Sequence, residues 1–377
     1  MTQKNIPFID LQAQRERLGA NLEQKILEVV REGKYINGPQ VAELEEQLSA
    51  FSGSKYVIGC ASGTDGLLMP LWAWGIGPGD AVFVPAFTFV SSAEVVAMLG
   101  ATPVFVDVDA TTFNMDIDSL NEAIDWTKTK SNLNPKAVIA VDLFGLPADL
   151  KTIETIAKQH EMKLLVDCAQ GFGSKQDGKV AVCYGDAGST SFFPAKPLGC
   201  YGDGGAIFTD DPELEKVLKS MRAHGQGSHR YEHVRLGMNG RLDTLQAAIL
   251  LEKLKIYPDE INKRNEIAAR YTQGLKDHVD TPTVPEGYES VWAQYTLKVS
   301  DRDALSQCLS EHGIPTMVYY PIPLSHQPAY KHYPMAPNGV PNSEKLSTQV
   351  LSLPIHPYLD IKTQNFIIEK VQDFCKG

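Results

Sequence analysis

Short β-branched runs alternate with helical stretches between residues 82 and 166, and this alternation constrains the fold more than any other feature. The expected strands lie at 82–84, 104–108, 137–141 and 164–166, and the expected helices between them lie at 91–99, 118–126 and 149–159. Repeated β/α units build a largely parallel sheet with helices on both faces. The sequence therefore predicts an α/β fold whose ligands bind at the carboxyl ends of the strands.

The flanking segments extend this pattern on both sides. Further helices are expected at 18–32 and 40–52, and further strands at 188–192 and 205–209. Pro258 separates an apolar helix at 242–255 from a polar one at 259–276, and a proline inside a helix usually interrupts it. At 377 residues the chain exceeds one average domain. We therefore expect a large domain over 1–257 and a smaller C-terminal α/β domain over 258–377.

The smaller domain should contain its own short strands and helices. Strands are expected at 291–299 and 315–319, and helices at 302–312 and 362–375. Residues 321–342 are dense in proline, which removes backbone donors and fixes φ. This stretch is predicted to be a surface loop without regular structure.

Composition and charge argue against several classes of function. The formal net charge is -11, and no basic stripe is visible, which disfavours a nucleic-acid partner. No run of about 18 apolar residues and no apolar leader occurs, so we expect a cytoplasmic protein without a membrane span. The six cysteines lack CxxC spacing, which disfavours a zinc site or a disulfide framework and leads us to expect no metal.

One lysine stands alone in the segment 191–205, SFFPAKPLGCYGDGG. Prolines lie close on either side of Lys196, and the glycines that follow permit tight turns. A solvated lysine has a pKa of about 10.4, so a nucleophilic amine must be desolvated or placed beside other cations. By itself, Lys196 is more simply a surface lysine in a loop. The whole segment, however, has a recognisable pattern.

The run Ser-Phe-Phe-Pro-x-Lys-x-Leu-Gly-x-x-Gly-Asp-Gly-Gly resembles the cofactor-lysine segment of the pyridoxal-phosphate (PLP) sugar aminotransferases, the DegT/DnrJ/EryC1/StrS family. The resemblance extends from FIDL at 8–11 to HPYLD at 356–360. It implies PLP as cofactor, fold type I (aspartate aminotransferase-like), and Lys196 as the amine that holds the PLP aldehyde and then moves a proton. A lysine at 196 is typical of the aminotransferase branch, whereas the dehydratase branch carries histidine there.

The same resemblance assigns three residues to the cofactor ring. Asp167, in VDCAQ, matches the aspartate of Asp-x-Ala-Gln that pairs with the pyridine nitrogen, and Gln170 matches the partner of the ring hydroxyl. Phe89 matches the aromatic residue that stacks on the ring. Without the resemblance, Asp167 would read as a helix cap and Phe89 as a core residue, with Phe87 as an equal candidate.

Four further residues match groups that bind the cofactor phosphate. Gly63 and Thr64 open a helix, where backbone N–H groups attract anions, and Ser191 precedes the lysine loop. Asp65 would repel a phosphate, so we expect it to cap that helix. Asn239 matches an asparagine that reaches the phosphate from a second subunit, which implies a homodimer with shared active sites. Alone, it would be a surface Asn-Gly turn.

Within the family, the chain is most similar to enzymes acting on UDP-2-acetamido-2-deoxy-3-oxo-glucuronate. Arg241 matches an arginine that pairs with the sugar carboxylate, a contact that guanidinium makes bidentately. Tyr319 stands where a histidine is expected beside the sugar, and Tyr320 follows it. The resemblance implies a ping-pong transfer from L-glutamate to the UDP-sugar, for a surface polysaccharide such as the O-antigen of lipopolysaccharide.

Other readings stay open at this point. An aminotransferase for a 4-keto-6-deoxy nucleotide sugar would have nearly the same sequence. A lyase or desulfurase would need a reactive cysteine in a mobile loop, and none stands out. A non-catalytic nucleotide-sugar-binding protein would tolerate loss of Lys196 or Asp167, yet both are present.

Overall fold

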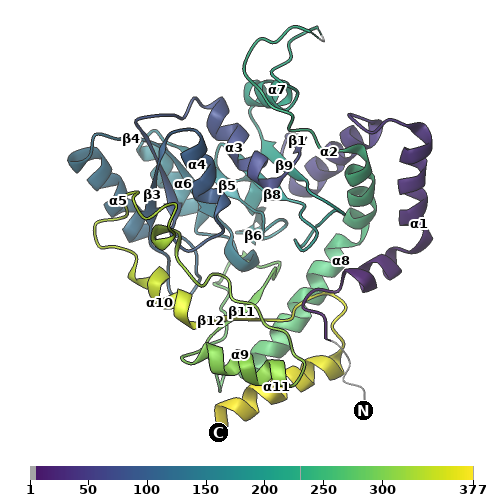
Figure 1. Ribbon diagram of the computed structural model, residues 1–377, viewed down its shortest axis with the longest axis vertical. Helices are drawn as coiled ribbons and strands as arrows, with labels where there is room; N and C mark the ends of the chain where they lie inside the picture. The colour runs from purple at the N-terminus through teal and green to yellow at the C-terminus, as the bar shows by residue number, and fades with distance from the viewer. Residues whose placement is uncertain (1–5, 230, 377) are drawn as a thin grey trace.

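A computed structural model of the chain describes residues 6–229 and 231–376; the first five residues, on which the expectation of no leader partly rests, lie outside the described part. The helices and strands in chain order are α1 (Leu11–Glu32), α2 (Pro39–Ser52), β1 (Tyr56–Cys60), α3 (Gly63–Ala73), β2 (Asp80–Pro85), α4 (Ser91–Met98), β3 (Thr102–Val106), α5 (Ile117–Lys130), β4 (Asn134–Val141), α6 (Leu150–Gln159), β5 (Lys163–Asp167), β6 (Lys175–Gln176), β7 (Lys179–Val180), β8 (Ala187–Ser191), β9 (Gly205–Thr209), α7 (Pro212–Met221), α8 (Thr244–Leu275), β10 (Tyr288–Glu289), β11 (Tyr295–Lys298), α9 (Arg302–Glu311), α10 (Pro341–Gln349), β12 (Val350–Leu353) and α11 (Ile361–Lys376) (Figure 1).

Seven strands form the large sheet in the order β1-β9-β8-β5-β4-β2-β3. The neighbours from β8 through β5, β4 and β2 to β3 are parallel, whereas β9 runs antiparallel to both β1 and β8. This confirms the predicted α/β fold with a largely parallel sheet. Strands β5 and β8 lie in the middle, so Asp167 and Ser191 at their carboxyl ends fall near the centre of the sheet edge.

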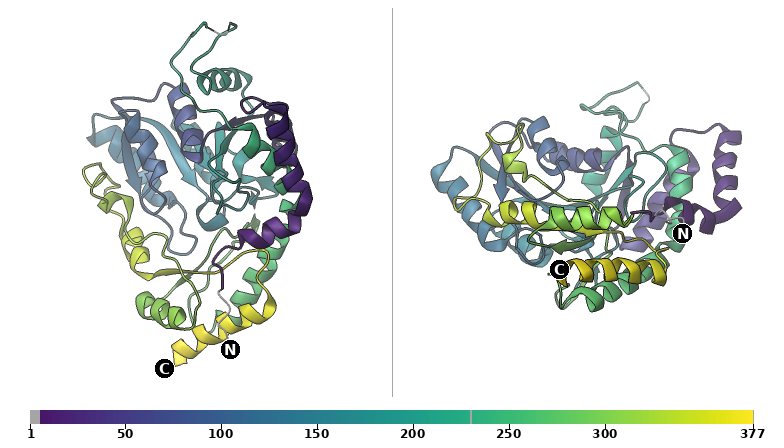
Figure 2. Two further views of the ribbon diagram at one scale, coloured as in Figure 1. Left: turned by 45° about the vertical axis from the view of Figure 1, so that its right-hand side comes forward. Right: turned by 60° about the horizontal axis from the view of Figure 1, so that its bottom comes forward.

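Helices cover both faces of this sheet, as the apolar strands require. On one face, Leu44 of α2, Ile153 of α6 and Leu250 of α8 pack in one hydrophobic core. On the other face, Leu71 of α3 and Val95 of α4 pack in a second core, with α7 beside them. The two further views in Figure 2 show the sheet between these layers.

The C-terminal part has a separate core beneath the sheet (Figure 1). Strands β11 and β12 pair antiparallel, and Tyr295 and Leu351 from these strands pack with Ile367 of α11. Tyr271, in the second half of α8, belongs to the same core, and so does Ile6 at the start of the described chain. Helix α8 therefore contributes to two cores, one in each half.

The predicted helix break at Pro258 is wrong, because α8 runs without interruption from Thr244 to Leu275. Proline removes one backbone hydrogen bond and disfavours a helix locally. Here Tyr257 and Glu260 on either side are 0% and 2% exposed, so tertiary packing holds the helix through the proline.

Two predictions for the C-terminal part also need correction. The strand expected at 315–319 is reduced to a single bridge between Met317 and Ser352. The proline-dense stretch 321–342 is not wholly a surface loop, because Leu324 and Val340 in it are 3% and 1% exposed. Among the described residues, no helix has both the length and the apolar character needed to cross a bilayer.

Candidate active site

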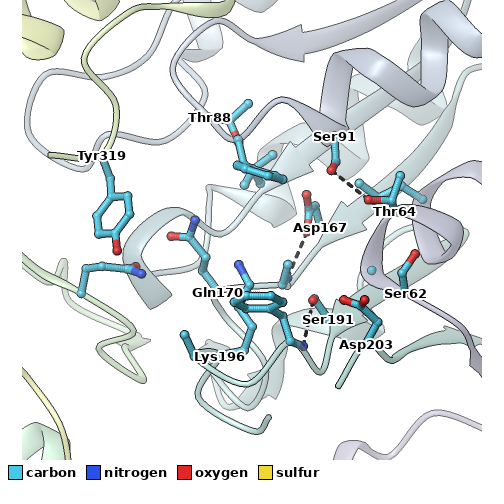
Figure 3. A pocket seen from close by; sticks show the side chains of 18 of the residues that line it. Ser62, Thr64, Thr88, Ser91, Asp167, Gln170, Ser191, Lys196, Asp203 and Tyr319 are labelled. Carbon is cyan, nitrogen blue, oxygen red and sulfur yellow. Dashed lines mark hydrogen bonds between the residues drawn. The ribbon is translucent and has the colours of Figure 1, made fainter. Parts of the chain in front are cut away.

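A cavity of about 430 Å³ opens at the carboxyl ends of the central strands, where the β/α pattern predicts a ligand site (Figure 3). Cavities of this size accommodate small-molecule ligands and cofactors. It brings together nine of the residues that the sequence singles out: Gly63, Thr64, Phe89, Asp167, Gln170, Ser191, Lys196, Tyr319 and Tyr320. Asn239 and Arg241 do not line it.

Lys196 and Asp167 form the electrostatic centre of the cavity. Burial lowers the pKa of the Lys196 amine, and the charge of Asp167 only partly offsets this effect. Burial raises the pKa of Asp167, while the N–H of Ala169 and the charge of Lys196 act in the opposite direction. An amine with a lowered pKa is more often neutral and therefore nucleophilic. The two groups are thus chemically suited to the covalent role and the ring-pairing role expected of them.

Fixed hydrogen bonds hold the polar groups after β5. Asp167 Oδ1 accepts from the N–H of Ala169 at 3.0 Å, and Oδ2 accepts from Ser92 Oγ at 3.5 Å. Gln170 Oε1 accepts from the N–H of Phe144 at 2.8 Å, and its Nε2 donates to the Tyr320 hydroxyl at 3.1 Å. Ser92 was missed by sequence reasoning, although the serine pair at 91–92, directly after Phe89-Val90, is a visible signal.

The N-terminus of α3 forms one end of the cavity. Ser62 caps it, since its Oγ accepts from the N–H of Asp65 at 3.0 Å; the expectation that Asp65 supplies the cap is wrong. A Cβ on Gly63 would lie 2.5 Å from Ser191 Cβ, so only glycine fits at this point. Thr64 Oγ1 lies 3.0 Å from Ser91 Oγ. Hydroxyl groups and helix N–H groups at one place make a suitable site for a phosphate.

The two candidate phenylalanines, Phe87 and Phe89, differ clearly in their exposure. Phe87 is 1% exposed and belongs to a hydrophobic core, whereas Phe89 is 52% exposed and lines the cavity. The Phe89 ring lies 6.2 Å from the ring of Tyr320, centroid to centroid. Of these two residues, Phe89 is therefore the one available to a flat ligand in the cavity.

Asn239 and Arg241 lie together outside the cavity of their own chain. Arg241 Nη2 donates to Asn239 Oδ1 at 2.7 Å, and Arg241 also forms a β-bridge with Cys60. The Asn239 side chain is exposed. Their predicted roles, contact with the cofactor phosphate of a second subunit for Asn239 and pairing with the sugar carboxylate for Arg241, stay predictions.

The residues present fit PLP. The cavity contains an amine, a carboxyl, an aromatic face and a helix N-terminus, which are the four features that PLP needs. Two buried polar atoms of the lining, Thr88 Oγ1 and Gln294 Oε1, have no hydrogen-bond partner among the described residues. Buried polar atoms are normally paired, so these two are available to a polar ligand. Sequence reasoning missed both, because only the folded chain shows which polar atoms are left unpaired.

Comparison with known proteins agrees with this site. An aminotransferase of Pseudomonas aeruginosa named for UDP-2-acetamido-2-deoxy-3-oxo-D-glucuronate is 47% identical over 356 residues, which cover 94% of this chain and 96% of the relative. A crystal structure of a DegT DnrJ EryC1 StrS aminotransferase from Brucella abortus is 51% identical, with a TM-score of 0.98 over 99% of this chain and 100% of that one. The PLP form of a putative sugar aminotransferase from Streptococcus pneumoniae is 27% identical, with a TM-score of 0.89 over 99% of both chains. Since residues 16–372 also match the DegT/DnrJ/EryC1/StrS aminotransferase family as a whole, the chain belongs to this family of PLP-dependent sugar aminotransferases.

Proposed function

We propose that the protein transfers the amino group of L-glutamate to the keto carbon of UDP-2-acetamido-2-deoxy-3-oxo-D-glucuronate, giving a 3-amino sugar for a surface polysaccharide such as an O-antigen. The main support for amino-group transfer is that the Lys196 amine and the Asp167 carboxyl line the same cavity. The choice of sugar is supported by the relative from Pseudomonas aeruginosa, which is named for this substrate.

PLP bound here would supply a carbonyl carbon that accepts the amino group and a ring that withdraws electrons from the reacting carbon. Lys196 holds the aldehyde and, once released, moves the proton at its Nζ between the two reacting carbons. Asp167 keeps the ring nitrogen protonated, and Gln170 contacts the ring hydroxyl. Phe89 covers the ring face. These roles are supported by the presence of all four side chains in one cavity.

The phosphate end uses Gly63, Thr64 and Ser191, with Asn239 of the partner subunit completing it in a homodimer. This assignment is supported by the helix N-terminus at Gly63 and by the location of Asn239 outside the cavity of its own chain.

We also propose that the large domain spans 1–257 and the small one 258–377. The change of core along α8 supports a boundary near Pro258. We place the enzyme in the cytoplasm, where UDP-sugars are made.

The substrate end uses Tyr319, Tyr320 and, across the dimer, Arg241. Burial raises the pKa of the Tyr319 hydroxyl, so it stays protonated near neutral pH and can donate a hydrogen bond to the sugar. Arg241 pairs with the sugar carboxylate, which a planar guanidinium can bind with two parallel hydrogen bonds.

A spectroscopic and kinetic experiment tests this proposal. Purified enzyme loaded with PLP should absorb in the visible range, and L-glutamate alone should bleach the band as the amino group is transferred. Amination of the UDP-3-oxo-glucuronate sugar should then exceed amination of a 4-keto-6-deoxy nucleotide sugar under the same conditions. The Lys196→Ala variant should neither show the band nor turn over. Turnover by that variant would refute the role of Lys196, and preference for the 4-keto sugar would refute the substrate.

Mixing two inactive variants tests the shared site. Lys196→Ala and Asn239→Ala each disable a site, but a mixed dimer retains one site with both native residues if Asn239 acts across the interface. Random reassociation should restore roughly a quarter of the native activity, since C₂ dimers form statistically. No recovery from the mixture would show that both residues act within one chain.

A further inference from the structure

Helix α8 contacts the loop that carries Lys196 with two side chains from one of its faces. Lys253 is 1% exposed, and its Nζ donates to the carbonyl oxygen of Gly199 at 2.6 Å. Gln246, about two helical turns earlier, accepts from the N–H of Tyr201 at 2.9 Å. The loop is therefore held three to five residues beyond Lys196, through residues that do not line the cavity.

The loop is compact, so a constraint at Gly199 reaches Lys196 through few bonds. A Cβ on Gly199 would lie 2.6 Å from the carbonyl oxygens of Phe193 and Pro194. The carbonyl of Phe193 in turn accepts from the N–H of Lys196 at 2.9 Å. Displacement of Gly199 would thus displace the turn from which the Lys196 side chain extends.

The use of a charged group at position 253 needs a reason, because burial of an ammonium group costs free energy that an apolar side chain would not. Besides the Gly199 carbonyl, Lys253 Nζ lies over the ring of Tyr201, 4.4 Å from its centroid. Burial lowers the pKa of Lys253 to about 8, while Glu260 and Cys200 favour its charged form. Unlike an apolar side chain, the Lys253 amine makes a directional hydrogen bond to one backbone carbonyl of the loop.

We propose that Lys253 is a positioning residue, which holds the 193–201 loop by its hydrogen bond to Gly199 and so fixes the Lys196 amine opposite Asp167. The proposal rests on the proposed function, in which Lys196 holds the cofactor. Lys253 itself does not touch the cavity. It acts on the reaction through the geometry of the loop.

The test compares PLP-loaded Lys253→Met with Lys253→Arg and with Lys255→Met as a matched control. Lys255 is on the same helix, but its side chain is 57% exposed and paired with Glu252. For Lys253→Met we expect about tenfold faster hydrogen exchange of the amides in 198–203. We also expect a shift of about one unit in the pH midpoint of the visible PLP band, and a lower kcat with KM little changed. Lys253→Arg should recover most of each effect, and Lys255→Met should match the native enzyme.

The results separate this proposal from the proposed function. Native exchange rates and a native band in folded Lys253→Met would overturn the positioning role, even if Lys196→Ala is inactive. Turnover by Lys196→Ala would instead overturn the proposed function. If Lys253→Met does not fold, Lys253→Gln, which is polar but too short to reach Gly199 in the same way, provides the same comparison.

Discussion

Replacing Asp142 by asparagine should make the stability of the protein less dependent on pH. Asp142 is fully buried behind the Asp167 loop, where its Oδ2 accepts from Cys168 Sγ at 3.0 Å and its Oδ1 accepts from the N–H of Ala148 at 3.1 Å. Burial raises the pKa of Asp142 to about 7; its hydrogen bonds oppose this rise, and the charge of Asp167 adds to it. Asp142 is therefore one of the carboxyl groups that folding forces toward the protonated form.

The sign and the size of the effect follow from linkage. Because the folded state binds this proton more tightly than the unfolded state, Asp142 stabilises the fold fully below pH 4 and loses that contribution as the pH rises through about 7. A shift of about three pKa units corresponds to roughly 4 kcal/mol in total, of which about 3 kcal/mol is lost between about pH 5 and about pH 8. The Asp142→Asn variant has no such proton to release.

Urea unfolding followed by circular dichroism, with native and variant protein side by side at several pH values, measures this contribution. The free energy of unfolding of Asp142→Asn, minus that of the native protein, should increase by about 3 kcal/mol from pH 5 to pH 8. Asp118 is exposed, so Asp118→Asn, measured over the same pH series, is the control for removal of a carboxylate that is not buried. A constant difference for Asp142→Asn would refute the argument that burial controls its ionisation.

Two further substitutions test the cofactor cradle and the attachment of the C-terminal part. Gly63→Ala would force a Cβ to 2.5 Å from Ser191 Cβ, so PLP affinity measured by absorbance titration should fall roughly ten- to a hundredfold, as expected for about 1–3 kcal/mol of overpacking. Asp107→Ala would remove a carboxylate that accepts from the N–H groups of Asn342 and Ser343 at 2.8 and 2.9 Å, at the start of α10. Chemical denaturation should show a loss of about 3 kcal/mol, because charged hydrogen bonds at a helix N-terminus are lost together.

The central sheet could be predicted because local pattern and tertiary structure agree there. Strands with continuous apolar runs, such as 137–141, are buried on both faces, so their composition already reflects their environment. The antiparallel direction of β9 could not be predicted, since period and composition do not distinguish a parallel from an antiparallel strand. The existence of β12 could not be predicted either, because its four residues become a strand by pairing with β11.

Most of the candidate site could be located because its residues follow the strands in short motifs. Asp167, Gln170 and Lys196 belong to the short motifs that carry the family resemblance, and the fold brings them into one cavity. Thr88 and Gln294 could not be found in this way. Gln294 is 98 residues from Lys196, and its significance lies only in an acceptor that the described part of the fold leaves unpaired.

Helix α8 shows why the rule that proline interrupts a helix does not hold at Pro258, and why the continuous helix matters for the site. Its first half packs against the sheet and holds the loop of Lys196 through Gln246 and Lys253, while its second half supplies Ile267 and Tyr271 to the C-terminal core. A break at the proline would uncouple these two halves. The buried residues on either side keep the helix continuous, so one uninterrupted helix both contacts the 193–201 loop and packs in the C-terminal core.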